Sequence, residues 1–288
     1  MPRCVYVNGR YLPYADATVH VEDRGYQFAD GIYEVYGVRQ GRLLDEEGHS
    51  ERLARSLREM KMDAPMSPRA LRLVCLETIR RNRVRNGLLY VQITRGVARR
   101  EHAFPEPPVG PSLVVTAWPV DLEKARAKAA KGLRVITVPD IRWGRCDIKT
   151  VALVPNVLAM NAAREAGTDD AWLLDENGMV TEGTRANVWI VDTEGNLITR
   201  YTDHAILSGI TRKSIMAVAA ERGLNVVERP FSAEEARAAR EAFVTGAGST
   251  VTPVVEVDGH VIANGVPGSI ATALRDAYET YAISHAAD

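Results

Sequence analysis

Lys149 is the residue whose surroundings point most directly to chemistry. It lies within Trp143–Val154, which is almost entirely apolar after the lysine, whereas the other five lysines have charged or polar neighbours. An apolar run of this kind is normally interior, and burial favours the uncharged amine that an imine-forming lysine needs. If the segment is extended, Arg145 and Asp147 share a face with Lys149. The alternative is that Lys149 reaches solvent and pairs with Asp147.

Two glycine-containing segments and one arginine are candidates for binding an anion. Ser208–Arg212 precedes a helical pattern, and a helix start presents free amide groups and the positive end of a dipole to a phosphate. A simple N-cap is the alternative. Thr245–Thr250 ends an expected strand, and its glycines let an anion approach the backbone. Arg52 adjoins the apolar stripe of an expected helix and offers a guanidinium, unless it is an ordinary surface arginine.

Glu182 is a carboxylate placed between two strand-like runs. A carboxylate entering apolar strands needs a polar partner. A protonated pyridine nitrogen is one such partner, because the charge makes the ring an electron sink. An ion pair with Arg185 or with another arginine is the alternative.

Arg100 and His102 follow a strand that ends near Arg95. If the chain stays extended there, both side chains point to one face and Glu101 points to the other. Arginine grips planar carboxylates through paired N–H bonds, so the pair is a candidate site for a substrate carboxylate. The alternative is a solvated basic loop.

The elements that must position these residues alternate between strands and helices. An Asn8-Gly9 pair within Val5–Tyr11 predicts a hairpin, and Gln40-Gly41 predicts a second one between Ile32–Val38 and Leu43–Leu44. Apolar spacing predicts helices over Ser50–Met60 and Pro68–Arg81. The remaining expected elements are strands at Leu88–Thr94, Ser112–Trp118, Leu133–Val138, Ala171–Leu174, Ala186–Val191 and Glu241–Thr245, and helices near Val157–Glu165, Thr211–Arg222 and Ile270–His285.

The composition changes at Trp118–Asp121, where a strand gives way to a charged, alanine-rich segment. This change predicts two mixed α/β domains, residues 1–119 and 120–288. With 288 residues, of which 46% are hydrophobic, the chain can bury a substantial core.

Charge and cysteine usage exclude several classes of function. The net charge of -1 gives no global field that favours nucleic acid or a membrane surface. The start resembles no secretory signal, and no apolar stretch is long enough to span a bilayer. The three cysteines are widely spaced and fit neither a disulfide framework nor a metal site. We therefore expect a cytoplasmic protein without a bound metal.

Taken in order, segments along almost the whole chain resemble the D-amino acid transaminases. This family belongs to the fold-type IV, or branched-chain aminotransferase-like, enzymes that use pyridoxal 5'-phosphate. The segments that carry the resemblance are Glu22–Phe28, Asp30–Val35, Gln92–Gly96, Ile141–Trp143, Arg145–Lys149, Val180–Gly183 with Asn187, Gly209–Arg212 and Thr252–Val254.

The resemblance implies a two-domain fold-type IV enzyme with the cofactor at the domain interface. Lys149 is then the catalytic lysine that forms the Schiff base, and Glu182 binds the pyridine nitrogen. The remaining cofactor-binding residues are then Arg52, Leu207, Ile210, Thr211 and Ala247. Tyr33, Arg100 and His102 match the residues that hold the substrate carboxylate in D-specific members.

The resemblance also implies a reaction and an assembly. D-amino acids such as D-alanine react with 2-oxoglutarate, giving a 2-oxo acid and D-glutamate, in a homodimer. Three departures affect details: Trp189 replaces a smaller aromatic residue, Ala152 replaces an asparagine, and Gly246-Ala247-Gly248 replaces a hydroxyl-rich turn.

Other activities remain open. On the same fold these are an R-selective amine transaminase, a branched-chain aminotransferase or an aminodeoxychorismate lyase. A non-catalytic cofactor-binding protein is the alternative from another class, although such a protein has no need for Lys149, Glu182 and the Arg100/His102 pair together.

Overall fold

The hairpin expected around Asn8-Gly9 begins the first sheet. The structure, a computed structural model, describes residues 3–286. Strands β1 (Cys4–Val7) and β2 (Arg10–Pro13) pair antiparallel across the turn. Asn8 and Gly9 have φ values of 43° and 91°, the left-handed conformation that a tight hairpin turn requires.

The first sheet has six strands in the order β2-β1-β6-β5-β3-β4. The second expected hairpin forms as β3 (Gly31–Arg39) and β4 (Arg42–Leu43). Strands β5 (Gly87–Thr94) and β6 (Ser112–Pro119) complete the sheet, and β3, β5 and β6 pair antiparallel along nearly their whole length. These predicted strands are confirmed.

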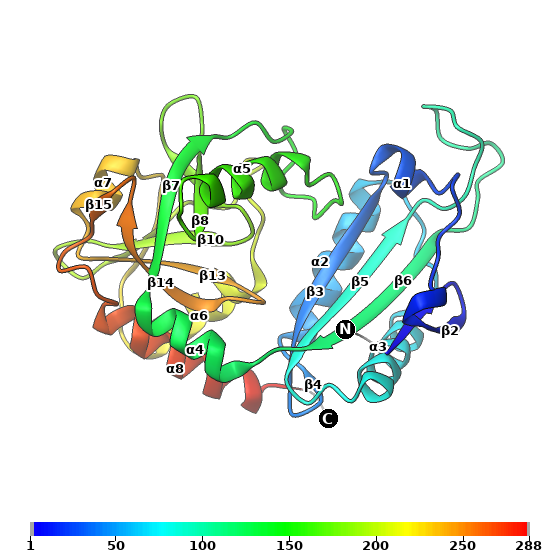
Figure 1. The fold of residues 1–288 in the computed structure, drawn as a ribbon, viewed down its shortest axis with the longest axis horizontal. Coiled ribbons are helices and arrows are strands. Elements are labelled where there is room, and N and C mark those ends of the chain that lie inside the picture. The colour runs from blue at the N-terminus through cyan, green and yellow to red at the C-terminus, as the bar shows by residue number, and fades with distance from the viewer. Residues whose placement is uncertain (1–2, 287–288) are drawn as a thin grey trace. The chain divides into compact units, whose positions relative to one another are not determined.

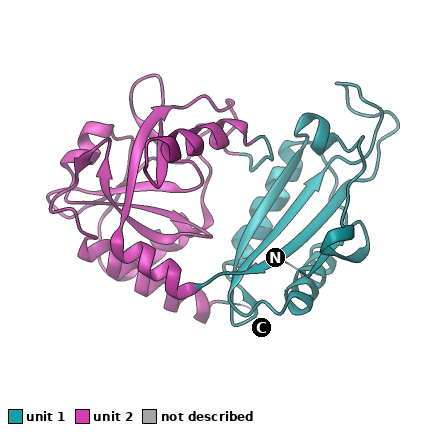
Figure 2. Ribbon diagram, viewed as in Figure 1, with its two compact units in different colours: residues 1–121, 148–152, 286–288 teal, residues 122–147, 153–285 magenta. Residues whose placement is uncertain are grey.

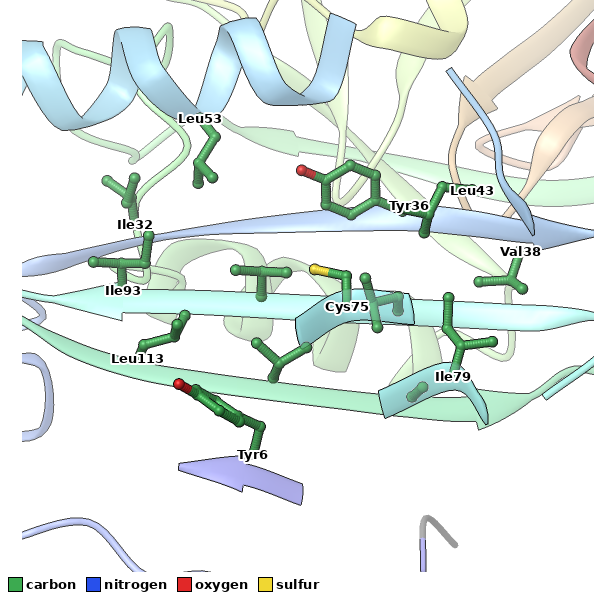
Figure 3. Close-up of a cluster of buried hydrophobic side chains, with 14 of the residues drawn as sticks. Tyr6, Ile32, Tyr36, Val38, Leu43, Leu53, Cys75, Ile79, Ile93 and Leu113 are labelled. Carbon is green, nitrogen blue, oxygen red and sulfur yellow. The ribbon is translucent and has the colours of Figure 1, made fainter. Parts of the chain in front are cut away.

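Two helices pack against this sheet, α2 (Glu46–Glu59) on β3 and α3 (Pro68–Asn82) on β6. Figure 3 shows Ile32, Tyr36 and Val38 of β3 together with Leu53 of α2 and with Cys75 and Ile79 of α3, in one apolar cluster. Because side chains alternate along a strand, the core takes one set of β3 residues and leaves Tyr33 on the opposite face. Both helices were predicted, although α2 begins at Glu46 rather than Ser50.

The second sheet has nine strands in the order β12-β11-β10-β13-β14-β7-β8-β9, with β15 paired to β14. Its strands are β7 (Leu133–Pro139), β8 (Asp170–Leu174), β9 (Val180–Gly183), β10 (Asn187–Val191), β11 (Leu197–Thr199), β12 (Val226–Glu228), β13 (Glu241–Gly246), β14 (Thr250–Val257) and β15 (His260–Val261). Pairing is parallel between β14 and β7 and antiparallel between β14 and β13. The sheet is therefore mixed.

Strand β14 was not predicted, although it lies inside the sheet. Pro253 interrupts its pattern, and a proline has no N–H to donate to a neighbouring strand. In the structure Pro253 lies opposite Phe243 of β13. The apolar residues around it bury the strand, as Val251 and Val254 show with 0% and 2% exposure.

The helices of the second half are α4 (Leu122–Lys131), α5 (Val154–Glu165), α6 (Ile210–Glu221), α7 (Ala233–Ala238) and α8 (Ser269–Ser284). The first half also has a 3-10 turn, η1 (Tyr14–Asp16), and the short helix α1 (Arg24–Phe28). Figure 1 shows how the sheets and helices follow one another along the chain. The mixed α/β class is confirmed.

The chain divides into two compact units (Figure 2). Unit 1 comprises residues 1–121, 148–152 and 286–288, and unit 2 comprises residues 122–147 and 153–285. Residues 148–152, which include Lys149, thus belong to the first unit although they lie in the second half of the chain. Among residues 3–286, no helix is both long and apolar enough to cross a membrane.

Candidate active site

Lys149 lies beside the first residues of β3. Its carbonyl accepts a hydrogen bond from the Tyr33 amide at 2.9 Å, and the Val151 amide donates to the Gly31 carbonyl at 3.1 Å. Thr150 forms a β-bridge with Ile32. The lysine backbone is therefore fixed against the strand, and its half-buried side chain points away from the two buried neighbours, Ile148 and Thr150.

The amine of Lys149 rests on an aromatic ring. Its Nζ lies 4.3 Å from the centre of the Tyr33 ring, an attractive position for an amine or an ammonium. Within residues 3–286 the structure gives this amine no ion pair. The alternative in which Lys149 pairs with Asp147 is thus not what the structure has.

Two expectations about this segment are wrong. Cys146–Asp147 forms a turn, so the chain is not extended from Trp143 to Lys149. The turn lets Arg145 bind Asp147 through two hydrogen bonds of 2.9 and 3.0 Å. The run after Lys149 is also not interior: it leads into α5, where the exposed fraction of Val154 is 69%. A run of apolar residues identifies a helix face as readily as a buried strand, which explains the error.

Tyr33 belongs to an aromatic and polar group on the face of the first sheet opposite the core. Its ring stacks on Tyr90 with centroids 5.5 Å apart, and the Tyr90 hydroxyl donates to Gln92 Oε1 at 2.7 Å. Burial raises the pKa of Tyr90, so this hydroxyl keeps its proton and donates. Tyr33 therefore contacts the Lys149 amine and, through its stacking on Tyr90, the hydrogen-bonded pair of Tyr90 and Gln92.

Arg52 is not a surface arginine, because α2 turns it into the interior. Its Nε and Nη2 donate to the two oxygens of Glu34 at 2.7 and 2.8 Å. His49 Nδ1 lies 2.7 Å from the same carboxylate. Burial by itself would raise the pKa of Glu34, but the Arg52 charge and the hydrogen bonds outweigh it and hold that pKa well below its usual range. The guanidinium is thus fixed by a permanent anion.

Arg100 and His102 lie in the irregular loop between β5 and β6 and are exposed. The Arg100 guanidinium carbon lies 4.8 Å from the centre of the Phe28 ring. The His102 ring lies 5.4 Å from the same ring. The structure therefore brings the two predicted residues together on one aromatic side chain.

In unit 2, the carboxylate of Glu182 accepts hydrogen bonds from a side-chain amide, a backbone amide and an arginine. Oε1 accepts hydrogen bonds from Asn187 Nδ2 at 3.0 Å and from the Leu207 amide at 3.1 Å. Oε2 accepts from Arg142. The alternative of an arginine partner for Glu182 is thus what the structure contains, with Arg142 rather than Arg185.

Arg142 was not identified as a site residue, although it lies in a segment that carries the resemblance. It binds Asp140 through Nε and Nη2 at 2.9 and 2.7 Å, and it donates to the Ala205 carbonyl at 2.9 Å. Burial would lower the pKa of Arg142, but the hydrogen bond to Asp140 and the charge of Glu182 raise it. Arg142 is therefore a fixed cation, and it favours the ionised form of Glu182.

The helix start at Ile210 and Thr211 is linked to Glu182. Asn187 Nδ2 also donates to the Leu207 carbonyl at 2.9 Å. Gly209 is the N-cap residue of α6 and supplies no side chain to cap the helix. A Cβ at Gly209 would lie 1.9 Å from Asn187 Oδ1, so this position has no room for another residue. The start of α6 is thus fixed by glycine packing and carries no side-chain cap.

Ala247 lies in the turn between β13 and β14. Thr250, which ends the turn, has a φ of 54°. The Arg275 guanidinium donates to the Ser249 carbonyl at 3.2 Å and to the Val251 carbonyl at 2.5 Å. Arg275 thus fixes the backbone at the end of the turn, while Ala247 is half-buried within the turn.

The described residues fit the groups of pyridoxal phosphate. An amine without an ion pair suits an aldehyde, an ionised carboxylate beside a fixed arginine suits a protonated ring nitrogen, and a helix start without a side-chain cap suits a phosphate. No group of three or more His, Cys, Asp or Glu side chains among residues 3–286 is arranged to hold a metal ion.

The comparisons with known proteins agree with this chemistry. A family model described as "Amino-transferase class IV" matches residues 31–257. A D-alanine aminotransferase of Bacillus licheniformis is 36% identical over 283 residues, which cover 98% of each chain. A second, of Staphylococcus epidermidis, is 35% identical over 281 residues, which again cover 98% of each chain.

Among solved structures, the fold is similar to that of branched-chain aminotransferases. The structure of the enzyme from the thermophilic archaeon Thermoproteus uzoniensis, solved with norvaline, has a TM-score of 0.85 at 26% identity. The match covers 99% of this chain and 96% of the archaeal one. This similarity extends over both sheets and confirms the fold-type IV architecture.

Proposed function

The chain belongs to the class IV aminotransferases and is a pyridoxal-phosphate-dependent transaminase, and on that premise we propose that it transfers the amino group of D-amino acids such as D-alanine to 2-oxoglutarate. The products are a 2-oxo acid and D-glutamate. The observation that carries the proposal is the Lys149 amine, which lies 4.3 Å from the Tyr33 ring without an ion pair in the described chain. The similarity to D-alanine aminotransferases supports the choice of substrate.

In this proposal Lys149 would bind the cofactor aldehyde through its amine, and Glu182 would pair with the ring nitrogen. The phosphate is bound by Arg52 and by the α6 amides at Ile210 and Thr211, and the backbone at Ala247 adds a donor. Leu207 packs on the ring. Glu34 supports this assignment for Arg52, since a fixed guanidinium loses little freedom when it binds an anion.

When bound, pyridoxal phosphate supplies the aldehyde that accepts the substrate amino group and a ring that spreads the charge left on the α-carbon. The Lys149 amine would hold the cofactor through its aldehyde and, when free, would act as the base that takes the proton from the substrate α-carbon. Arg142 and Asn187 keep Glu182 ionised and oriented, so that it holds a proton on the ring nitrogen.

The substrate carboxylate is held by Arg100, His102 and Tyr33 in this proposal. A guanidinium, an imidazole and a phenol hydroxyl are donors suited to the two oxygens of a carboxylate. Amines without a carboxylate gain nothing from such a site. This distinguishes the proposal from an R-selective amine transaminase.

The test begins with the purified protein and pyridoxal phosphate. We expect a yellow protein that converts D-alanine and 2-oxoglutarate to pyruvate and D-glutamate, with L-alanine as the control substrate. Lys149→Ala removes the visible absorption and the activity. Arg100→Ala raises KM for D-alanine much more than for an amine without a carboxylate. Equal activity on L-alanine would refute the assignment of substrate hand.

A homodimer and a cytoplasmic location also belong to this proposal. Val154, Val157 and Leu158 of α5 are exposed by 69%, 63% and 56% and lie at helical spacing, which supports an apolar contact between chains. Light scattering should give twice the mass of the 31.6 kDa chain, and Leu158→Glu should reduce it. Fractionation of the source cells tests the location.

A further inference from the structure

The loop between β5 and β6 carries Arg100 and His102 without any regular structure of its own. The loop comprises residues 95–111. Loops as long as this are uncommon in compact proteins unless they have a function, and side-chain contacts have to keep them ordered. Val97 forms a β-bridge with Asp23 at the start of the loop. The contacts farther along the loop come from a buried group of ions.

Asp30 is the centre of that group. Its carboxylate accepts hydrogen bonds from Arg24 Nε at 2.8 Å and from Arg95 at 2.7 and 3.0 Å. The exposed fractions of Arg24, Asp30 and Arg95 are 3%, 8% and 8%. Two arginines share one carboxylate, so each buried guanidinium needs further acceptors. The carbonyl groups of Lys61 and Met60 supply them for Arg95.

Arg24 takes its further acceptors from the loop. Its Nη1 donates to the Glu101 carbonyl at 2.5 Å, and its Nη2 lies 3.4 Å from the His102 carbonyl. Glu101 is the residue between Arg100 and His102. Arg24 therefore holds the backbone at the point from which both proposed carboxylate donors extend.

Phe28 provides a second connection between Arg24 and the loop, because its ring contacts the side chains of Arg24, Arg100 and His102. Arg24 and Arg100 each lie with the guanidinium carbon 4.8 Å from the centre of its ring, and His102 lies 5.4 Å from it. An arginine on an aromatic face is attracted to it, and stacking limits the positions that the guanidinium takes. One end of α1 thus supplies the arginine, and the other end supplies the ring.

We propose that Arg24 is the positioning residue of the substrate-carboxylate site: held by Asp30, it fixes the backbone between Arg100 and His102 and, with Phe28, their side chains. This rests on the proposed function of Arg100 and His102. Arg24 itself does not contact the substrate, since its Nε, Nη1 and Nη2 already have protein acceptors. Its effect is to lower the entropy that the loop loses when a carboxylate binds.

Arg24→Met tests the proposal with little disturbance of the ion group, because Asp30 keeps Arg95 as its partner. We expect KM for D-alanine to rise about tenfold, as for loss of about 1.4 kcal/mol of binding. The turnover number with D-alanine should remain nearly unchanged. KM for (R)-1-phenylethylamine, which has no carboxylate, should also remain nearly unchanged. Arg24→Lys should be intermediate, since an ammonium lacks the planar fork.

The matched control is Arg72→Met. Arg72 pairs with Glu46 elsewhere in the same unit, at 2.9 Å. Its substitution removes an arginine ion pair without touching the loop, and it should leave KM for D-alanine unchanged. Phe28→Leu is a second variant, which keeps the ion group and removes the ring. Like Arg24→Met, it should raise KM for D-alanine.

Trypsin supplies a readout that does not depend on catalysis, because it cleaves after Arg99 and Arg100. Arg24→Met should be cut there several-fold faster than the parent and than Arg72→Met, and it should bind propionate more weakly by calorimetry. Parent-like cleavage and KM would overturn the proposal. If the parent lacks activity on D-amino acids, the proposed function fails, whereas the cleavage rates still decide whether Arg24 holds the loop.

Discussion

Asn187 Nδ2 donates to Glu182 Oε1 at 3.0 Å and to the Leu207 carbonyl at 2.9 Å. One buried amide thus ties the carboxylate to the segment that leads into α6. The carboxylate and the helix start, which we assign to two different groups of the cofactor, are therefore not independent of each other.

This link predicts that Asn187→Asp weakens cofactor binding more than Asn187→Ala. The alanine variant loses two hydrogen bonds and leaves the Leu207 carbonyl without that donor, at a cost of about 1–3 kcal/mol. The aspartate variant adds a second carboxylate beside Glu182, and repulsion between the two raises the pKa of one of them, so that Glu182 is ionised for less of the time. Titration with pyridoxal phosphate measures both. Asn161→Asp, on the exposed face of α5, is the control.

Gly209→Ala should lower stability and cofactor affinity together. The new Cβ would lie 1.9 Å from Asn187 Oδ1 and 3.1 Å from its Cγ, whereas the φ of -64° suits any residue. The effect is therefore steric, and overpacking of this kind costs about 1–3 kcal/mol. Urea unfolding and cofactor titration measure it. Gly110→Ala, whose Cβ would meet nothing within 4 Å, is the control, and equal behaviour of the two variants would contradict the prediction.

The Glu34 ion group makes stability depend on pH. The pKa of Glu34 is lowered in the folded chain, because the charge of Arg52 and the hydrogen bonds outweigh the effect of burial. Its contribution is therefore present above the unfolded pKa of about 4.3 and is lost as the pH falls further. Burial also lowers the pKa of His49 in the folded chain. As the pH falls below about 6.5, the unfolded chain therefore takes up a proton on this histidine before the folded chain does, and the free energy of unfolding decreases.

Urea unfolding at pH values between about 3 and 7 tests this, because these values lie on both sides of the pKa of an unfolded glutamate. We expect Glu34→Gln to lose about 3–5 kcal/mol at neutral pH, as for a buried ion pair without one partner, and to show a flatter pH profile. Glu77→Gln is the control, since Glu77 pairs with Arg80 and Arg81 at the surface. A parallel profile for Glu34→Gln and the parent would exclude Glu34 as the source.

Two of the three thiols should resist alkylation. Burial raises the pKa of Cys75 to about 12 and that of Cys146 to about 11, so little of the reactive thiolate is present near neutral pH. Cys4 is half-buried in β1. Iodoacetamide followed by peptide mass spectrometry should find Cys4 labelled first, and all three labelled equally in urea. Labelling of Cys146 as fast as Cys4 in the folded protein would contradict the assignment.

The sequence by itself determined the elements whose signals are local. The Asn8-Gly9 and Gln40-Gly41 turns predicted both hairpins, because left-handed backbone conformations restrict the residues that a tight turn accepts. Strand β14 escaped prediction, since Pro253 is a local signal against a strand and only the burial of its neighbours outweighs it.

The order of motifs also determined the family and the candidate lysine, but the partners of each side chain depended on the tertiary structure. Asp147 is two residues from Lys149, yet a turn gives it to Arg145, while Tyr33, more than a hundred residues earlier, lies under the lysine amine. Arg52 read as a possible surface residue and is fixed by Glu34. Hydrogen bonds and stacking depend on distances of a few ångströms, and only the packing of strands and helices brings residues so far apart in the chain within that range.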